Sequence, residues 1–326
     1  MNNRYENLIE KSLHGGEIIR DDIQWIMESE DVELLPLLYA AFKVREKYFG
    51  KNVKIHILNN VKSGNCSENC HYCAQSHEAD NEIEKYPVKT REEIIQGACD
   101  ATNGGAFRYC MVFSGSRQSP ANIDFICDVV SEIKEKYSIE TCVSAGFIEE
   151  GDIIRLKQAG VDRYNHNLNT SEFHYGQICT SHSYKDRYNT IVMAHKYGLD
   201  ICSGIIAGMG ESLDDIFSII RDLKAVKVKS VPVNFFIPIE GHRISQYQTL
   251  TPEYCLKLLS VFRFALPDVE IRCAGGREYH LRSMQALSLY PANSIFAQGY
   301  LTTGGDGIDE AKRMVTDAGF TVELSD

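Results

Sequence analysis

Hydrophobic residues recur every three or four positions in residues 18–27 and 33–49, and this spacing predicts two amphipathic helices. After residue 52, short runs of branched and aromatic residues alternate with longer amphipathic stretches. The short runs predict strands at residues 53–58, 107–113, 140–145, 163–168, 200–206, 231–236, 269–273 and 294–296. The longer stretches predict helices at residues 91–102, 123–137, 149–159, 184–197, 214–224, 252–264, 278–289 and 309–318.

This strict alternation of strand and helix predicts an α/β fold, a (β/α)8 barrel of the TIM type with an N-terminal helical extension. The expected division is residues 1–50 for the helical extension and residues 51–326 for the barrel domain. An open, doubly wound sheet with fewer strands is the alternative. In a barrel the active site lies at the C-terminal ends of the strands, so we expect functional side chains in the loops that follow them.

Composition narrows the possible partners and location. The 326 residues carry a net charge of -11, which argues against a nucleic-acid partner because such proteins need a basic face. No apolar stretch reaches the 18 residues of a membrane span, and the first residues lack the apolar core of a signal peptide. Eleven cysteines in such a chain predict reduced thiols in a cytoplasmic protein, serving metal binding or catalysis.

Three cysteines, Cys66, Cys70 and Cys73, follow the first predicted strand with the spacing C-x3-C-x2-C. Three thiolates on so short a loop can hold three irons of a cubane iron–sulfur cluster and leave the fourth iron open for chemistry. Thiolates also suit zinc, but structural zinc sites are closed by a fourth ligand, usually from a second ligand pair. No matching pair follows in the sequence, so the spacing favours a cluster over a zinc knuckle.

A second set of cysteines, Cys110, Cys142 and Cys202, falls within the second, third and fifth predicted strands. Any one of them would be explained as a small buried residue, but three on barrel strands favour a second metal site. The seventh predicted strand ends in Arg272 and Cys273. Neighbouring side chains on a strand face opposite sides, so a regular strand presents only one of these two to the interior.

The first cysteine loop, with Tyr72 just before its third cysteine, resembles the signature of the radical S-adenosylmethionine (SAM) superfamily. Over most of the chain the sequence further resembles the biotin synthases, a family within that superfamily. The segments that carry this second resemblance are residues 66–76, 109–111, 164–168, 202–204, 208–211, 231–234, 276–278 and 292–296.

The resemblance implies that Cys66, Cys70 and Cys73 are catalytic, holding a [4Fe–4S] cluster whose open iron binds SAM. It implies SAM contacts from Tyr72, Asn167, Asn169 and Arg187, and contacts to the substrate dethiobiotin from Asn165, Asn167 and Asn234. Amide groups offer both a donor and an acceptor, which suits the ureido ring of dethiobiotin. Turn or strand-end capping by the asparagines, and a surface charge for Arg187, remain open as structural roles.

Two departures from the family pattern affect these expectations. Asn169 stands where many members carry an aspartate for the SAM ribose, although an amide oxygen can still accept a hydrogen bond from a hydroxyl. The resemblance implies that Cys110, Cys142, Cys202 and Arg272 hold an auxiliary [2Fe–2S] cluster. An inward Cys273 would add a fourth thiolate, and the sequence analysis favours this four-iron arrangement because packing alone explains that cysteine poorly. The loop thiol Cys179 is a further candidate for the auxiliary site.

The expected function is therefore the insertion of sulfur into dethiobiotin at C9 and C6, with SAM as the radical source and the auxiliary cluster as the sulfur donor. The resemblance also implies flavodoxin or ferredoxin as electron donor, and a homodimer. One alternative is another radical SAM enzyme of the same subfamily, a mutase or a hydrogenase-cofactor maturase. The others are a non-catalytic iron–sulfur carrier and a zinc-stabilised structural protein.

Overall fold

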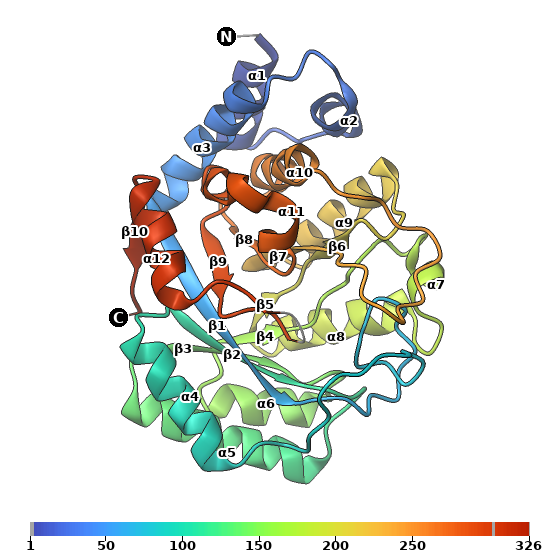
Figure 1. Cartoon of the computed structure of the whole chain (residues 1–326), viewed down its shortest axis with the longest axis vertical. Coiled ribbons are helices and arrows are strands. Elements are labelled where there is room, and N and C mark those ends of the chain that lie inside the picture. Colours follow the sequence, from blue (N-terminus) through green and yellow to red (C-terminus); the bar gives the residue numbers. More distant parts are fainter. Residues whose placement is uncertain (1–2, 302–303, 326) are drawn as a thin grey trace.

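The computed structural model describes residues 3–301 and 304–325 and contains one parallel sheet that closes on itself (Figure 1). The strands are β1 (Asn52–Lys62), β2 (Arg108–Phe113), β3 (Glu140–Ser144), β4 (Arg163–Asn165), β5 (Asp200–Cys202), β6 (Ile205–Ala207), β7 (Ser230–Phe235), β8 (Glu270–Cys273), β9 (Ser294–Ala297) and β10 (Thr321–Glu323). Closure comes from β1, which pairs with β2 on one edge and with β9 on the other. The predicted barrel is thus confirmed.

Helices follow the strands and cover the outside of the barrel, as Figure 1 shows for α4, α5 and α6 below β1, β2 and β3. They are α1 (Asn3–Leu13), α2 (Arg20–Glu28), α3 (Leu34–Phe49), α4 (Arg91–Asn103), α5 (Pro120–Lys136), α6 (Glu150–Gln158), α7 (Tyr175–Ile178), α8 (Tyr184–Lys196), α9 (Leu213–Ala225), α10 (Pro252–Ala265), α11 (Arg277–Leu281) and α12 (Ile308–Asp317), with a 3-10 helix η1 at Arg282–Leu289. Among the described residues, no helix is long and apolar enough to cross a membrane.

The helices that precede β1 pack against α10, beside which they lie in Figure 1. Ser12 Oγ donates a hydrogen bond to the carbonyl oxygen of Phe264 at 2.9 Å, and so ties α1 to the end of α10. Helix α10 is buried along almost its whole length, because the barrel lies on one side of it and α1–α3 on the other.

Four local features differ from the sequence prediction. The fifth strand is split into β5 and β6 around Gly204, where a Cβ atom would lie only 2.0 Å from the Pro232 carbonyl oxygen. The helix expected at residues 278–289 is broken into α11 and η1 at Arg282, whose φ of 51° does not fit a continuous α-helix. Strand β10, which extends the sheet beside Asn52–Lys54, and the short helix α7 were not predicted.

Candidate active site

A cavity of about 290 Å³ opens at the C-terminal ends of the strands, the end where barrel enzymes carry their active sites. Its walls come from the loops after β1, β2, β3, β4, β7, β8 and β9. Nine residues proposed from the sequence line this single cavity: Cys66, Cys70, Tyr72, Cys73, Asn165, Asn167, Asn169, Arg187 and Asn234. The fold therefore brings together side chains that lie up to 168 positions apart in the chain.

The loop after β1 folds back on itself and turns its three cysteines toward the cavity. The amide of Cys73 donates to the carbonyl of Cys70 at 3.1 Å, and the amide of Cys66 donates to the carbonyl of Gln75 at 3.3 Å. Burial raises the pKa of the Cys73 thiol above its ordinary value. The pKa of Cys70 is also raised, first because its thiol donates to Cys179 Sγ at 3.7 Å and second because it is buried.

Tyr72 and Asn169 meet across the cavity. Asn169 Nδ2 donates to Tyr72 Oη at 2.6 Å, and Asn169 takes a left-handed backbone conformation with a φ of 71°. Asparagine tolerates this conformation better than most residues, and here it fixes the amide against the tyrosine. Arg187 is partly buried in the cavity wall, where its Nη1 donates to the carbonyl of Asn167 at 3.0 Å and its Nε to Tyr175 Oη at 2.5 Å. Arg187 is therefore not a surface charge.

The asparagines proposed as substrate contacts are not equivalent. Asn165 Nδ2 lies 3.3 Å from Asn167 Oδ1 and 3.3 Å from Cys202 Sγ, so it links the cavity to the strand cysteines below. The amide of Asn234 is held by backbone groups, donating to Ile205 O at 3.1 Å and accepting from the Gly275 amide at 3.0 Å. Asn234 thus also has the structural role of joining β6, β7 and the loop after β8.

Cys110, Cys142 and Cys202 gather deeper in the barrel, in one buried cluster with Ala274 and Phe296. Cys110 and Cys142 are direct partners in the β2–β3 register. Arg272 reaches this cluster from β8, with its Nη1 at 3.7 Å from Cys202 Sγ. Cys110, Cys142 and Arg272 line a second, small cavity that shares Ser144, Asn165 and Tyr300 with the larger one.

Cys273 lies on the opposite side of β8 from Arg272, as the alternation of a strand requires. Its thiol is buried near Ser288 of η1 and Arg277 of α11, and burial raises its pKa to about 12. The expectation that Cys273 adds a fourth thiolate to the strand cysteines does not agree with this geometry. Arg272 takes the inward position, and Cys273 packs between the barrel and its outer helices.

Two groups of side chains suit iron–sulfur clusters. The upper group is Cys66, Cys70 and Cys73, and the lower group, deeper in the barrel, is Cys110, Cys142, Cys202 and Arg272. In the upper group, three thiols line a cavity wide enough for a bound molecule. In the lower group, Arg272 Nε is buried without a hydrogen-bond partner among the residues that the structure describes, and Arg272 Nη1 faces a sulfur. An unused donor on a buried cation beside three thiols fits an anionic sulfur-containing group, which would accept its hydrogen bond.

Two family models match the chain. Residues 60–223 match the model of the radical SAM superfamily, and residues 232–321 match that of the biotin and thiamin synthesis associated domain. A biotin synthase of Magnetococcus marinus is 50% identical over 298 residues, 91% of this chain and 93% of the relative. A biotin synthase of Bacillus licheniformis is 44% identical over 321 residues, 98% of this chain and 96% of the relative.

The chain belongs to the biotin synthase family. Solved structures agree on the fold. Methylornithine synthase superposes with a TM-score of 0.81 at 19% identity over 98% of both chains. The FeFe-hydrogenase maturase HydG from Carboxydothermus hydrogenoformans superposes with a TM-score of 0.84 at 18% identity, over 99% of this chain and 80% of that one. At such low identity these two likenesses concern the fold alone.

In this member of the biotin synthase family, a buried charge network lies beneath Arg272 that the sequence analysis did not anticipate. Glu270 accepts hydrogen bonds from Arg272 Nη2 at 2.5 Å, Arg163 Nη1 at 3.1 Å and Arg108 Nη1 and Nη2 at 3.2 Å. Burial opposes ionisation of Glu270, but the three arginines outweigh it and hold its pKa well below the ordinary value. The sequence does carry a signal for this network. Arg108, Arg163 and Glu270 each stand two positions before a residue expected to face inward, so the alternation of a strand turns them inward too.

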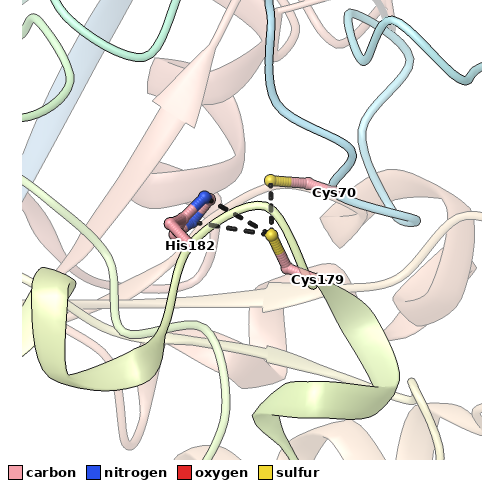
Figure 2. A group of neighbouring side chains, drawn as sticks. All are labelled: Cys70, Cys179 and His182. Atoms are coloured by element: carbon pink, nitrogen blue, oxygen red, sulfur yellow. Dashed lines mark hydrogen bonds between the residues drawn. The ribbon is translucent and has the colours of Figure 1, made fainter.

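The structure also reassigns Cys179, which the sequence analysis considered for the auxiliary site. Cys179 lies in the loop after α7 and meets Cys70 at the upper group, with 3.7 Å between the two sulfurs (Figure 2). Its sulfur is also 3.4 Å from His182 Nδ1. No sequence spacing indicated this contact, because Cys70 and Cys179 are 109 positions apart.

Proposed function

We propose that the protein inserts sulfur into dethiobiotin to form biotin, in a reaction that consumes SAM. The observation that carries this proposal is the stacking of two cysteine triplets in one barrel, joined by a cavity. Ser144, Asn165 and Tyr300 line both the upper cavity and the space around Cys110, Cys142 and Arg272. The identity of 44–50% to biotin synthases over most of the chain supports it.

In the proposed arrangement, Cys66, Cys70 and Cys73 bind a [4Fe–4S] cluster, and Cys110, Cys142, Cys202 and Arg272 bind the auxiliary [2Fe–2S] cluster. When bound, these groups supply the electron that cleaves SAM into methionine and a 5′-deoxyadenosyl radical, and the sulfur that enters the product. Everything else falls to the side chains of the barrel, which bind, orient and shield the reactants.

Tyr72 and Asn169, already joined by a hydrogen bond, are placed to hold the adenosyl part of SAM from one side of the cavity. Arg187 presents its partly buried charge in the cavity wall, where a carboxylate such as that of the methionine part of SAM would gain a charge-assisted hydrogen bond. Asn167 supplies its backbone carbonyl to orient Arg187 and its amide oxygen to orient Asn165.

Dethiobiotin is proposed to lie between the two cysteine triplets, with its ureido ring against Asn165, Asn167 and Asn234. Asn165 is the best placed of these for chemistry, because its amide reaches both the cavity and Cys202 Sγ. A substrate carbon held above Asn165 would face the radical source on one side and the sulfur source on the other. With the radical source, the substrate carbon and the sulfur source held in line, the reactants need not meet by diffusion in solution.

The proposal extends to the partners of the reaction. A low-potential electron must come from outside the barrel, and flavodoxin or ferredoxin are the expected donors. We further propose that the protein acts in the cytoplasm as a homodimer. It follows from the open-iron cluster that the purified protein is sensitive to oxygen.

The test separates the two halves of the proposal. Cys110, Cys142 and Cys202 are replaced together by alanine, and the reconstituted protein is given SAM, dethiobiotin and a chemical reductant. We expect 5′-deoxyadenosine and methionine to form while biotin does not. A Cys99→Ala/Cys127→Ala variant, which changes two cysteines on the outer helices α4 and α5, should make both products at the wild-type level. Biotin in wild-type yield from the triple variant would refute the sulfur-donor role.

A further inference from the structure

Cys70, Cys179 and His182 form a compact group at the edge of the upper cavity (Figure 2). One ligand atom from each lies within 4.8 Å of the other two, although the residues come from two separate loops. Cys70 and His182 line the cavity, so an ion entering there would reach the group directly. Cysteine sulfur and histidine nitrogen are the ligands preferred by divalent iron, cobalt and zinc.

The distances match those of a single tetrahedral ion. With metal–sulfur bonds of about 2.3 Å and metal–nitrogen bonds of about 2.0 Å, tetrahedral ligands lie about 3.8 Å apart for two sulfurs and about 3.5 Å apart for sulfur and nitrogen. The sulfurs of Cys70 and Cys179 are 3.7 Å apart. Cys179 Sγ lies 3.4 Å from His182 Nδ1 and 3.7 Å from His182 Nε2. Cys70 Sγ and a His182 nitrogen lie within 4.8 Å of each other, so an ion would need at most a closer approach of these two side chains.

The histidine is held in an orientation that suits a metal ligand. Glu68 Oε2 is 2.6 Å from His182 Nδ1, the pairing of carboxylate and imidazole that often supports metal-bound histidines. His182 Nε2 lies 2.9 Å from Tyr175 Oη and accepts from Arg187 Nε at 3.1 Å, so this nitrogen carries the lone pair that a metal needs, and an ion would take the place of both contacts. Arg187 would keep its bonds to Tyr175 and Asn167.

The loop that carries Cys179 is fastened to the cysteine loop near Cys70. Asn69 Oδ1 accepts hydrogen bonds from the amides of Thr180 at 3.0 Å and Ser181 at 2.9 Å. The amide of His71 donates to the carbonyl of Ile178 at 2.9 Å. These bonds flank Cys70 and Cys179 on both sides, so the short distance between their sulfurs is built into the loops.

We propose that Cys70, Cys179 and His182 bind one divalent transition-metal ion, iron or zinc, in the protein before its clusters are assembled. The fourth coordination position is open to water from the cavity. Cys70 is shared with the [4Fe–4S] cluster of the proposed function, so the ion and that cluster exclude each other. The site would thus hold a single metal ion at the place where the cluster is built. Only this sharing rests on the proposed function, whereas binding of the ion does not.

The test uses a variant of the full chain in which the other clustered cysteines cannot bind metal: Cys66→Ser, Cys73→Ser, Cys110→Ser, Cys142→Ser and Cys202→Ser. Cobalt(II) is titrated into this cluster-free parent under reducing, oxygen-free conditions, and tetrahedral thiolate binding is followed by its intense visible absorption. We expect one cobalt per chain. Zinc bound at the same site should show X-ray absorption distances of about 2.3 Å to two sulfurs and about 2.0 Å to nitrogen.

Ligand variants made in this parent decide the assignment. Cys179→Ser and His182→Gln should each weaken cobalt binding at least about tenfold, while Cys127→Ser, a matched change on α5, should leave it unchanged. Circular dichroism checks that each variant is folded. Equal cobalt affinity in the parent and in Cys179→Ser, or zinc with a single sulfur neighbour, would overturn the proposal.

The sharing of Cys70 is tested with a chain that keeps Cys66, Cys70 and Cys73 but carries Cys110→Ser, Cys142→Ser and Cys202→Ser, so that the strand cysteines hold no zinc. Protein loaded with one zinc is reconstituted with iron and sulfide, and zinc release is read with a coloured chelator. We expect one zinc to leave as the iron–sulfur absorption appears. A fully formed cluster with the zinc retained would refute the sharing, while failure to form any cluster in zinc-free protein would instead count against the proposed function.

Discussion

Glu270→Gln is expected to destabilise the protein more than any surface change of charge. Gln has nearly the shape of Glu, so the substitution removes one negative charge and leaves the packing intact. In the native protein Glu270 is 4% exposed and accepts from Arg108, Arg163 and Arg272. In the variant one carboxylate oxygen becomes an NH2 donor that faces the arginines, and the remaining neutral oxygen and Ser230 Oγ, at 2.9 Å from Arg272 Nη2, carry no charge to balance the arginines.

The expected loss in the free energy of unfolding follows from how deeply the arginines that pair with Glu270 are buried. The side chains of Arg108 and Arg272 are 0% and 2% exposed, so water cannot replace the lost carboxylate. Arg108 retains Glu140, with Nε and Nη2 at 2.9 and 2.5 Å, which limits the loss at that residue. Removing one partner of a buried ion pair typically costs about 3–5 kcal/mol. Against a total stability of about 5–15 kcal/mol, this is a large share.

Urea unfolding of the cluster-free protein, followed by circular dichroism at pH 7.5, measures this change in free energy. The matched control is Glu149→Gln, which breaks an ion pair with Arg117 whose side chains are 72% and 50% exposed. We expect the control to change the free energy of unfolding by about 1 kcal/mol or less. If Glu270→Gln costs no more than the control, the buried network does not stabilise the barrel and the reasoning fails.

Three further predictions concern pH, backbone approach and cluster ligation. Burial lowers the pKa of His56 and His166 in the folded protein, so folding is favoured with both rings neutral. Stability should be complete above the unfolded pKa of about 6.5 and fall by up to about 1.4 kcal/mol per histidine for each pH unit below it, as urea titrations at pH 7.5, 6.5 and 5.5 would show. Gly204→Ala should lower the urea midpoint sharply, because its Cβ meets the Pro232 carbonyl at 2.0 Å. Cys273→Ala should leave the iron content after reconstitution and the [2Fe–2S] Mössbauer signal unchanged, whereas loss of iron would return this thiol to the auxiliary site.

The fold could be predicted from the sequence because each helix and strand shows its hydrophobic pattern within its own residues. Alternating strands and helices show their periods within single elements, and the eight predicted strands appear in the barrel. The break at Gly204 was not accessible, because it depends on the approach of the Pro232 carbonyl from another strand. Strand β10 was missed for the same reason, since its three residues form a strand by pairing with β1, which is distant in the sequence.

Some residues of the candidate site could be predicted from the sequence, and others could not. The spacing of Cys66, Cys70 and Cys73 lies within eight residues, so the motif alone predicted three cysteines for one site, and all three line the cavity. The contact between Cys70 and Cys179 depends instead on how two loops dock, through Asn69 and the amides of residues 180 and 181. Their docking is a tertiary interaction, for which neither loop carries a signal of its own.

Whether Arg272 or Cys273 faces the barrel interior could have been predicted from the charged residues on the neighbouring strands. Cys110 faces the interior only if Arg108, two residues earlier, faces it too. A buried arginine requires a carboxylate, because an unpaired charge inside the barrel is too costly. Glu270 can provide it only when its side of β8 faces inward, and Arg272 shares that side. The partner required by Arg108 therefore turns Arg272 toward the three thiols and Cys273 away from them.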